Sequence, residues 1–314
     1  MITSIVFIAF ALLLLFFGAE GLVRGSSSLA LRAGLSPLLV GLTIVAFGTS
    51  SPELVVSVKA ALDQQGDLSV GNVVGSNSFN IGIILGLTAL LCPIPVHRQI
   101  IKIDAPIALG VAGLLLLFLQ DKILTRNEGL VLLIGIIAYT AMNIVLARKE
   151  ASNGKVSKDE SLSGVSKNWM IDIVFILGGL GILVLGSRLL VDNSITLAKA
   201  FGVSEAVIGL TIVAAGTSMP ELATSIVAAV RKQPDIAIGN VVGSNVFNIL
   251  GILGVASVIS PIHAPGISWI DYAAMIIFTA LLIPLLYAGR VLHRIEGILL
   301  LALYCGYLFL LWPK

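Results

Sequence analysis

Residues 41–86 read GLTIVAFGTSSPELVVSVKAALDQQGDLSVGNVVGSNSFNIGIILG, and residues 209–254 read GLTIVAAGTSMPELATSIVAAVRKQPDIAIGNVVGSNVFNILGILG. The two stretches align without a gap, and 30 of their 46 positions are identical. Apolar bias alone could match many Val, Ile and Leu positions, but it could not place GTS-x-PEL and GNVVGSN-x-FNI in one register. The chain therefore contains the same unit twice, at an offset of 168 residues.

The same offset relates residues outside these two stretches. The further matches are Ile5–Ile8 with Ile173–Ile176, Gly18 with Gly186, and Glu128-Gly129 with Glu296-Gly297. We therefore predict two repeats, 1–147 and 169–314, each containing one of the quoted stretches. The segment 148–168 between them is rich in Lys, Ser, Gly and Glu, and is predicted to be a solvated linker.

The composition places most of this chain in lipid. Of 314 residues, 57% are hydrophobic and 11% are charged, which is about half the charged fraction of a soluble domain. A spanning helix needs about 20 mainly apolar residues, and the sequence offers ten such stretches. We predict an all-α integral membrane protein with ten transmembrane helices as two inverted five-helix repeats. The predicted spans are 3–31, 36–61, 69–92, 103–120, 127–147, 170–200, 204–229, 237–260, 268–288 and 294–312.

The number of spans in each repeat and the positive charges predict the orientation. Because each repeat has an odd number of spans, the second enters the membrane from the opposite side, as in inverted-repeat transporters. One side of the membrane receives twelve Lys and Arg, and the other receives five. The richer side should be cytoplasmic, which places the linker inside and both termini outside. The positive charges are dispersed, so no nucleic-acid partner is expected.

Glu53 and Glu221 each lie in the middle of an otherwise apolar span. An ionised carboxylate in hydrocarbon costs several kcal/mol on any scale, so it needs a partner or a wet cavity. No Lys or Arg lies at a comparable depth in the neighbouring motif segments. The remaining partner is a mobile cation.

The backbone beside each Glu is predicted to be broken. Pro52 and Pro220 lack an N–H, so the carbonyls of Gly48 and Gly216 lose their helical partners. Both glycines also make unwinding easier. Carbonyl oxygens freed at membrane depth need a polar cavity or protein partners, and together with a carboxylate they suit a hard cation.

Further side-chain oxygens accompany these segments. Asn72, Ser76 and Asn80 are four residues apart and share one helix face. The full candidate set is Thr49, Ser50, Asn72, Ser76, Asn80, Thr217, Ser218, Asn240, Ser244 and Asn248. Its ligands are all oxygen, which argues against zinc or copper.

Several residues near this set have simpler interpretations. For Asn72 and Asn240, bracing of the helix pair remains open beside ion contact. Asn77 and Asn245 leave the stripe and are expected to be structural. The repeated GxxxG of the same spans, 71–75 and 239–243, predicts close backbone approach. Cys92 and Cys305 show no metal spacing and are interpreted as packing residues.

The motifs GTSSPEL with GNVVGSNSFNIG, and GTSMPEL with GNVVGSNVFNILG, resemble the two alpha-repeats of the sodium/calcium exchanger family. The resemblance covers nearly the whole chain and is nearest to prokaryotic members with short cytoplasmic linkers. It implies a secondary active antiporter of the prokaryotic plasma (inner) membrane that exchanges several Na⁺ for one Ca²⁺ by alternating access. The first and sixth spans would slide across the other eight.

The resemblance also implies roles for individual residues. Calcium would bind Glu53 and Glu221 with the Thr49 and Thr217 regions, and the positions of Asn80 and Asn248 also belong to the calcium and sodium sites. Sodium would use the Ala46 and Ala214 carbonyls with Ser50, Ser218, Ser76 and Ser244. In many relatives one of the positions of Asn80 and Asn248 is an aspartate. Here both are Asn, so only two formal negative charges remain.

Other functions remain as alternatives. H⁺/Ca²⁺ exchange and K⁺-dependent Na⁺/Ca²⁺ exchange use the same type of site. A passive cation channel and a membrane enzyme are disfavoured; the sequence has no HExxH, no P-loop and no Ser with a nearby intramembrane His. We therefore expect no enzymatic activity, no cofactor beyond the transported Ca²⁺ and Na⁺, and a monomer in the lipid bilayer.

Overall fold

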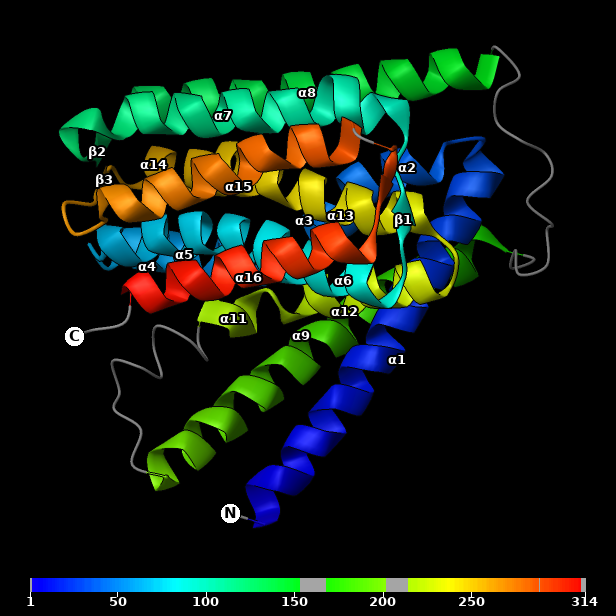
Figure 1. Cartoon of the computed structure of the whole chain (residues 1–314), viewed down its shortest axis with the longest axis horizontal. Coiled ribbons are helices and arrows are strands. Elements are labelled where there is room, and N and C mark those ends of the chain that lie inside the picture. Colours follow the sequence, from blue (N-terminus) through cyan, green and yellow to red (C-terminus); the bar gives the residue numbers. More distant parts are fainter. Residues whose placement is uncertain (1, 153–167, 202–213, 288, 312–314) are drawn as a thin grey trace.

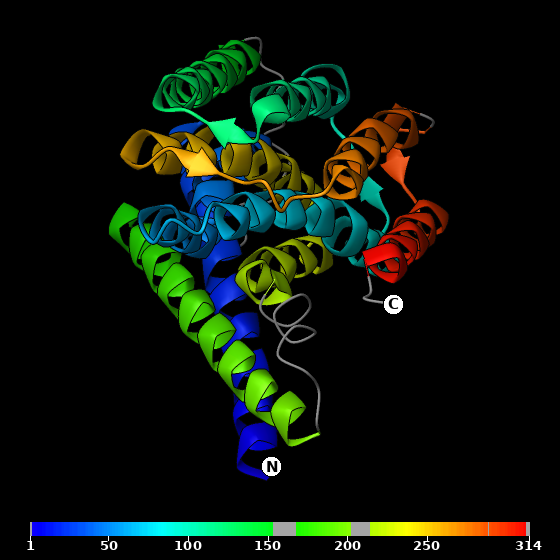
Figure 2. The same cartoon turned by 90° about the vertical axis from the view of Figure 1, so that its left-hand side faces the viewer.

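The computed structural model describes residues 2–152, 168–201, 214–287 and 289–311 (Figure 1). Most helices of this part of the chain lie side by side in one bundle, and two long helices leave it at an angle (Figures 1 and 2). The helices of the first half are α1 (Ile2–Ala33), α2 (Pro37–Val40), η1 (Gly41–Val45), α3 (Ala46–Thr49), α4 (Ser51–Leu62), α5 (Gly66–Phe79), η2 (Asn80–Leu85), α6 (Gly86–Leu91), η3 (Ile100–Asp104), α7 (Ala105–Phe118), η4 (Leu119–Asp121) and α8 (Arg126–Ser152). Those of the second half are α9 (Trp169–Ala200), α11 (Ala214–Thr217), α12 (Met219–Val230), α13 (Pro234–Phe247), η6 (Asn248–Leu253), α14 (Gly254–Ile259), α15 (Trp269–Tyr287) and α16 (Arg294–Leu311).

The helices confirm an all-α, multi-pass membrane architecture. Within the described ranges, eight helices are long and apolar enough to cross a bilayer, and a ninth span results if the bent pair Pro37–Thr49 and Ser51–Leu62 counts as one. The predicted span 204–229 falls partly outside the described residues, which include only α11 and α12 from it. Ten spans in two repeats therefore stays a prediction.

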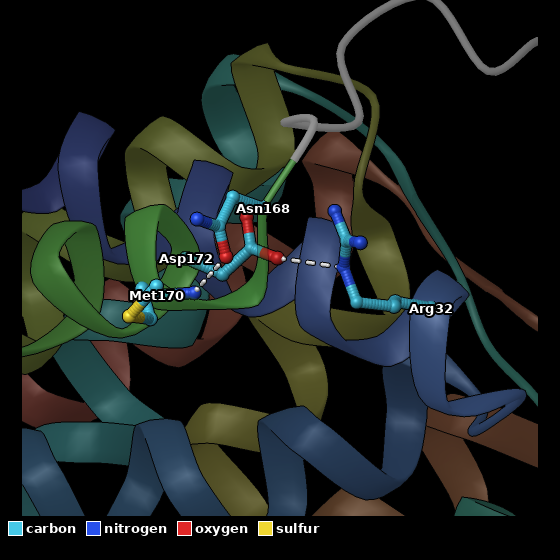
Figure 3. A network of polar contacts seen from close by, with 4 residues as sticks. All are labelled: Arg32, Asn168, Met170 and Asp172. Carbon is cyan, nitrogen blue, oxygen red and sulfur yellow. Dashed lines mark hydrogen bonds and ion pairs between the residues drawn. The ribbon is translucent and has the colours of Figure 1, made fainter.

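The predicted linker, 148–168, begins later than the sequence suggested, whereas α9 begins at Trp169, directly after its predicted end. α8 was expected to end at 147 but continues to Ser152, because Arg148, Lys149 and Ala151 are good helix formers. At the other end, the Asn168 side chain accepts the Met170 N–H at 3.0 Å and caps α9 (Figure 3). Residues 153–167 lie outside the described part of the chain.

Two short antiparallel ladders join the halves at opposite ends of the bundle (Figure 1). β1 (Ile94–Pro95) pairs with β4 (Val291–Leu292), and β2 (Ile123–Leu124) pairs with β3 (Ile262–His263). The 168-residue offset relates β1 to β3 and β2 to β4, so each ladder takes one strand from each half. The ladders tie the loops of the bundle together, and they are two-residue exceptions to an otherwise helical chain.

Burial separates two central spans from the outer helices. In the spans Gly66–Leu91 and Pro234–Ile259, 78% of the most apolar window is buried, against 28% in α1 and in α9, 22% in Arg126–Lys149 and 17% in Arg294–Leu311. Large apolar side chains such as Phe10, Phe17 and Val174 are exposed on α1 and α9. Such surfaces suit lipid, whereas a soluble protein rarely exposes them contiguously.

α1 and α9 pack tightly against each other. A Cβ at Gly179 would lie 2.6 Å from the Leu22 nitrogen, and one at Gly25 would lie 2.7 Å from the Asp172 carbonyl oxygen. Where α1 ends and α9 begins, Arg32 Nε lies 3.1 Å from Asp172 Oδ2 (Figure 3). The Asp172 side chain has 0% exposure. Small residues and a buried ion pair make these two helices one unit.

Two smaller expectations have mixed outcomes. The second GxxxG is confirmed, since a Cβ at Gly243 would lie 2.7 Å from the Leu42 carbonyl oxygen of η1. The corresponding partners of Gly71 and Gly75 fall at 209–210, outside the described residues. The packing interpretation was wrong for Cys305, which is exposed on α16, while Cys92 is half-buried.

The close contact of α13 with η1 predicts a stability effect. Gly243→Ala should destabilise the protein by about 1–3 kcal/mol, because the new methyl group overlaps the Leu42 backbone. Gly113→Ala on α7 is the control, because its Cβ meets no atom within 4 Å. Thermal unfolding of both variants in detergent measures the difference. Equal stability would contradict the packing described.

Candidate cation site

The second span breaks where the sequence analysis expected. α3 ends at Thr49 and α4 starts at Ser51, with a bend of 48° between the two halves of the span. Glu53 lies in the first turn of α4, and Glu221 lies in the first turn of α12. Both side chains are only 1% exposed. The breaks thus place each carboxylate at a helix N-terminus, where backbone N–H groups favour negative charge.

The predicted helix breakers have a second role against α9. Pro52 and Pro220 occupy the first turn of α4 and α12. A Cβ at Gly48 would lie 2.7 Å from the Leu180 side chain, and one at Gly216 would overlap Val191. The Ser187 hydroxyl donates to the freed Gly216 carbonyl. These glycines therefore allow α9 to cross the breaks closely, a role that the sequence did not suggest.

Each acid is held by a serine from the other half. Ser50 Oγ donates to Glu221 Oε1 at 2.8 Å, and Ser218 Oγ donates to Glu53 Oε1 at 3.0 Å. The same hydroxyls lie 3.0 Å from Ser244 Oγ and 3.2 Å from Ser76 Oγ, respectively. This crossed pattern brings six of the predicted residues, the two acids and four serines, to one place between the halves.

Asn72 and Asn240 brace the broken helices. Asn72 Nδ2 donates to the Glu53 carbonyl at 3.2 Å and to Ser57 Oγ at 2.9 Å. Asn240 Nδ2 does the same with the Glu221 carbonyl at 3.3 Å and Ser225 Oγ at 3.0 Å. The geometry favours the bracing interpretation that the sequence left open.

The threonines and alanines of the motif occupy the same region. Thr49 Oγ1 lies 3.0 Å from Asn240 Oδ1, and Thr217 Oγ1 lies 3.5 Å from Asn72 Oδ1. The Ala46 carbonyl accepts the Ser50 N–H at 3.1 Å. Ala214 is the first described residue of α11.

A ring of four asparagine amides joins the halves beside the acids. Asn77 Nδ2 donates to the Asn245 carbonyl at 3.0 Å, and Asn245 Nδ2 donates to the Asn77 carbonyl at 3.2 Å. Asn80 Nδ2 donates to Asn245 Oδ1 at 2.9 Å, and Asn248 Nδ2 donates to Asn77 Oδ1 at 3.0 Å. From their place outside the polar stripe, Asn77 and Asn245 are predicted to be structural, and these contacts give them that role. Their repetition at the 168 offset within an apolar span was the signal for this link.

Four buried oxygens at this junction accept no hydrogen bond from the described residues. They are Glu53 Oε2, Glu221 Oε2, Asn80 Oδ1 and Asn248 Oδ1. The ring fixes the amide nitrogens of Asn80 and Asn248, which leaves their oxygens free. Unpaired buried acceptors cost free energy unless a ligand satisfies them, and a carboxylate with amide oxygens suits a hard cation.

The charge of the site is set by the two acids alone. Across the described ranges, no group of three or more His, Cys, Asp and Glu could hold a metal, and neither Glu53 nor Glu221 is in an ion pair. The site therefore carries two formal negative charges and no compensating side chain. It can accept one divalent cation or two monovalent cations without excess charge.

Comparisons with known proteins identify the family of this chain. The model of the sodium/calcium exchanger protein family matches residues 3–145 and 171–312. The chain thus belongs to the sodium/calcium exchanger family, as a member of the prokaryotic type. It is 37% identical to the inner membrane protein YrbG of Escherichia coli over 270 residues, which are 85% of this chain and 83% of YrbG.

Two relatives named as exchangers match over nearly their full length. The chain is 30% identical to the sodium/calcium exchanger MaX1 of Methanosarcina acetivorans, with 94% of each chain covered. It superposes on a solved structure of the sodium-calcium exchanger NCX_Mj, soaked with Na⁺ and Ca²⁺, with a TM-score of 0.84. The identity there is 31%, and all of both chains is covered.

The amide ring predicts a stability effect that does not depend on ions. Asn77→Ala should lower the free energy of unfolding by about 1–3 kcal/mol, because it leaves the buried Asn248 amide and the Asn245 carbonyl without partners. Asn245→Ala should lower it by a similar amount, because Asn245 occupies the equivalent position in the second repeat. Asn193→Ala is the control, since that amide donates only to the Leu189 carbonyl of its own helix. Unfolding in calcium-free detergent measures all three; a loss no larger than the control's would refute the link.

Proposed function

We propose that this chain is a secondary active antiporter that exchanges Na⁺ for Ca²⁺ across the plasma membrane by alternating access. The observation that carries the proposal is the set of four unpartnered oxygens, two from each half, buried where the broken helices meet. Membership of the exchanger family, and the names of MaX1 and NCX_Mj, support Ca²⁺ and Na⁺ as the ions.

The proposed ligands form two groups, one for Ca²⁺ and one for Na⁺. Ca²⁺ would bind the free oxygens of Glu53, Glu221, Asn80 and Asn248, with Thr49 and Thr217 beside them. Na⁺ would spread over the flanking oxygens, which are those of Ser50, Ser218, Ser76 and Ser244 and the carbonyls of Ala46 and Ala214. Ser50 and Ser218 each contact an acid of the opposite half, so they connect the two groups of ligands.

Competition for two charges would couple the fluxes. One Ca²⁺ neutralises both acids, and so do two Na⁺, while a third Na⁺ would leave the site positive. An empty site with two negative charges is costly in a low-dielectric interior. That cost would discourage the unloaded carrier from changing access, so net movement would require an ion.

The arrangement of helices supports a sliding mechanism. α1 and α9 form one tightly packed unit outside the bundle, while two ladders hold the loops of the remaining helices. Movement of this pair across the broken helices would expose the site to one side and then the other. We further propose a monomer in the inner membrane, with the 148–168 region cytoplasmic and both termini outside, from the distribution of Lys and Arg.

Glu53→Gln and Glu221→Gln test the function. Each change removes one of two charges from the site, so Na⁺-driven ⁴⁵Ca²⁺ uptake in vesicles should fall by at least about tenfold, the equivalent of ~1.4 kcal/mol. Glu128→Gln is the matched control, because this exposed acid caps the start of α8 through Thr125. Uptake that survives both single changes would refute the proposal.

The alternative transport modes can be separated in proteoliposomes. Na⁺, K⁺ and H⁺ gradients are imposed one at a time, and Ca²⁺ flux is measured. Exchange driven by H⁺ in sodium-free buffer would indicate that protons replace sodium on the two acids. A requirement for K⁺ would indicate K⁺-dependent exchange. A channel would show flux without saturable counterflow.

A further inference from the structure

The two halves differ in how α1 and α9 lie against the broken helices. Ala19 and Val23 of α1 pack in one apolar cluster with Val227 and Ala228 of α12. The 168-residue offset relates α1 to α9 and α4 to α12, so α9 should pack on α4 in the same way. Instead, a cavity of about 310 Å³ separates α9 from the first turns of α4.

This cavity borders the cation site. Its walls include Pro52 and Val56 from the α4 side and Arg188 and Val191 from α9, and it reaches Thr217. Pro52 precedes the buried Glu53, and the Thr217 hydroxyl lies beside Asn72. The gap between α9 and α4, which holds the cavity, is called the open side below, and the packed contact of α1 with α12 is called the closed side.

An ion pair lies on the closed side. Arg231, which caps the end of α12, places Nη2 at 2.6 Å from Glu20 Oε1 and Nε at 2.8 Å from Glu20 Oε2. The pair therefore joins α1 to the bundle through two parallel contacts. The Glu20 side chain is 20% exposed and that of Arg231 is 57% exposed, so the pair is partly screened by its surroundings.

The repeat relation places a pair of reversed charge on the open side. The 168 offset converts Glu20 into Arg188 on α9, and it converts Arg231 into Asp63, which caps the end of α4. Both members change sign, so the corresponding positions of the two halves carry opposite charges. Among the described residues, neither Arg188 nor Asp63 forms an ion pair. Arg188 lines the cavity instead.

We propose that Arg188 and Asp63 pair when α9 closes onto α4, and that the Glu20–Arg231 pair opens in the same movement. The two pairs then act as alternating latches, one for each side of the membrane. α1 and α9 are locked together by glycine packing and by Arg32–Asp172, so closing one gap opens the other. The inference rests on the proposed exchange function only for the assignment of the two states as transport states.

Cross-linking of cysteine pairs tests the latches in the full chain. The background has Cys92 and Cys305 replaced by Ala. Two double variants are made in it, Glu20→Cys/Arg231→Cys and Asp63→Cys/Arg188→Cys. Each is cross-linked in vesicles with saturating Ca²⁺ or with Na⁺, and the ion is added to one side of the vesicle membrane at a time. A short bifunctional reagent should link the two pairs reciprocally, so that conditions raising one yield lower the other. Each link should arrest transport reversibly. Leu62→Cys/Arg188→Cys is the proximity control, because Leu62 is exposed beside Asp63.

Charge exchange provides a second test that needs no cross-link. Arg188→Glu should slow exchange by about two- to fivefold, the range expected for one partly exposed ion pair. Asp63→Arg in the same chain should restore the rate, because the pair forms again with its signs reversed. Glu20→Arg with Arg231→Glu should behave in the same way.

The outcomes separate this inference from the proposed function. If Na⁺/Ca²⁺ exchange is measured but Asp63 and Arg188 never cross-link beyond the Leu62 control, the latch is wrong and the function stands. If the pairs cross-link reciprocally but only protons drive Ca²⁺ flux, the latch stands and the sodium assignment is wrong. Simultaneous linking of both pairs in one molecule would overturn the latch.

Discussion

Two buried acids that form no ion pair with any described Lys or Arg are the constraint on which the rest of this molecule depends. Glu53 and Glu221 are almost fully buried, and each accepts only part of the hydrogen bonds that a carboxylate can accept. Their charge must be met by something mobile. The helix breaks, the serines and the threonines place the remaining oxygens around the same point, so the local irregularities of the fold serve one electrostatic requirement.

The surrounding structure keeps that point rigid while allowing access to it. The asparagine ring and the Asn72 and Asn240 braces hold the broken helices across the boundary between the halves. The two ladders fix the loops at both ends of the bundle. By contrast, α9 crosses the breaks at Gly48 and Gly216 through the apolar side chains of Leu180 and Val191, and its described side-chain hydrogen bond there is that of Ser187 to the Gly216 carbonyl.

The difference between the halves is as informative as their likeness. The repeat makes the two access routes chemically similar, yet one is packed and the other holds a cavity. Two nearly equivalent arrangements of a duplicated unit have similar free energies. The binding of an ion, or one charge pair, can therefore shift the equilibrium from one arrangement to the other. The reversed signs at Glu20 and Arg188 fit such a choice.

The sequence by itself determined the membrane class, the duplicated unit, the breaks at Pro52 and Pro220, and the acids at Glu53 and Glu221. These features depend on hydropathy, on missing N–H groups and on isolated charges, all of which are local properties of the chain. It also identified Asn80 and Asn248, whose spacing of four from Ser76 and Ser244 is a helical repeat.

Only the tertiary structure decided the crossed pairing of Ser50 with Glu221 and Ser218 with Glu53, the role of Asn77 and Asn245, and the fit of α9 against Gly216. The continuation of α8 to Ser152 also had to be observed. The crossed serine–glutamate pairs and the contacts of Asn77 with Asn245 depend on which surface of one half meets the other. Local sequence patterns do not contain that information, because these contacts join residues about 170 positions apart, as in the 171 that separate Ser50 from Glu221.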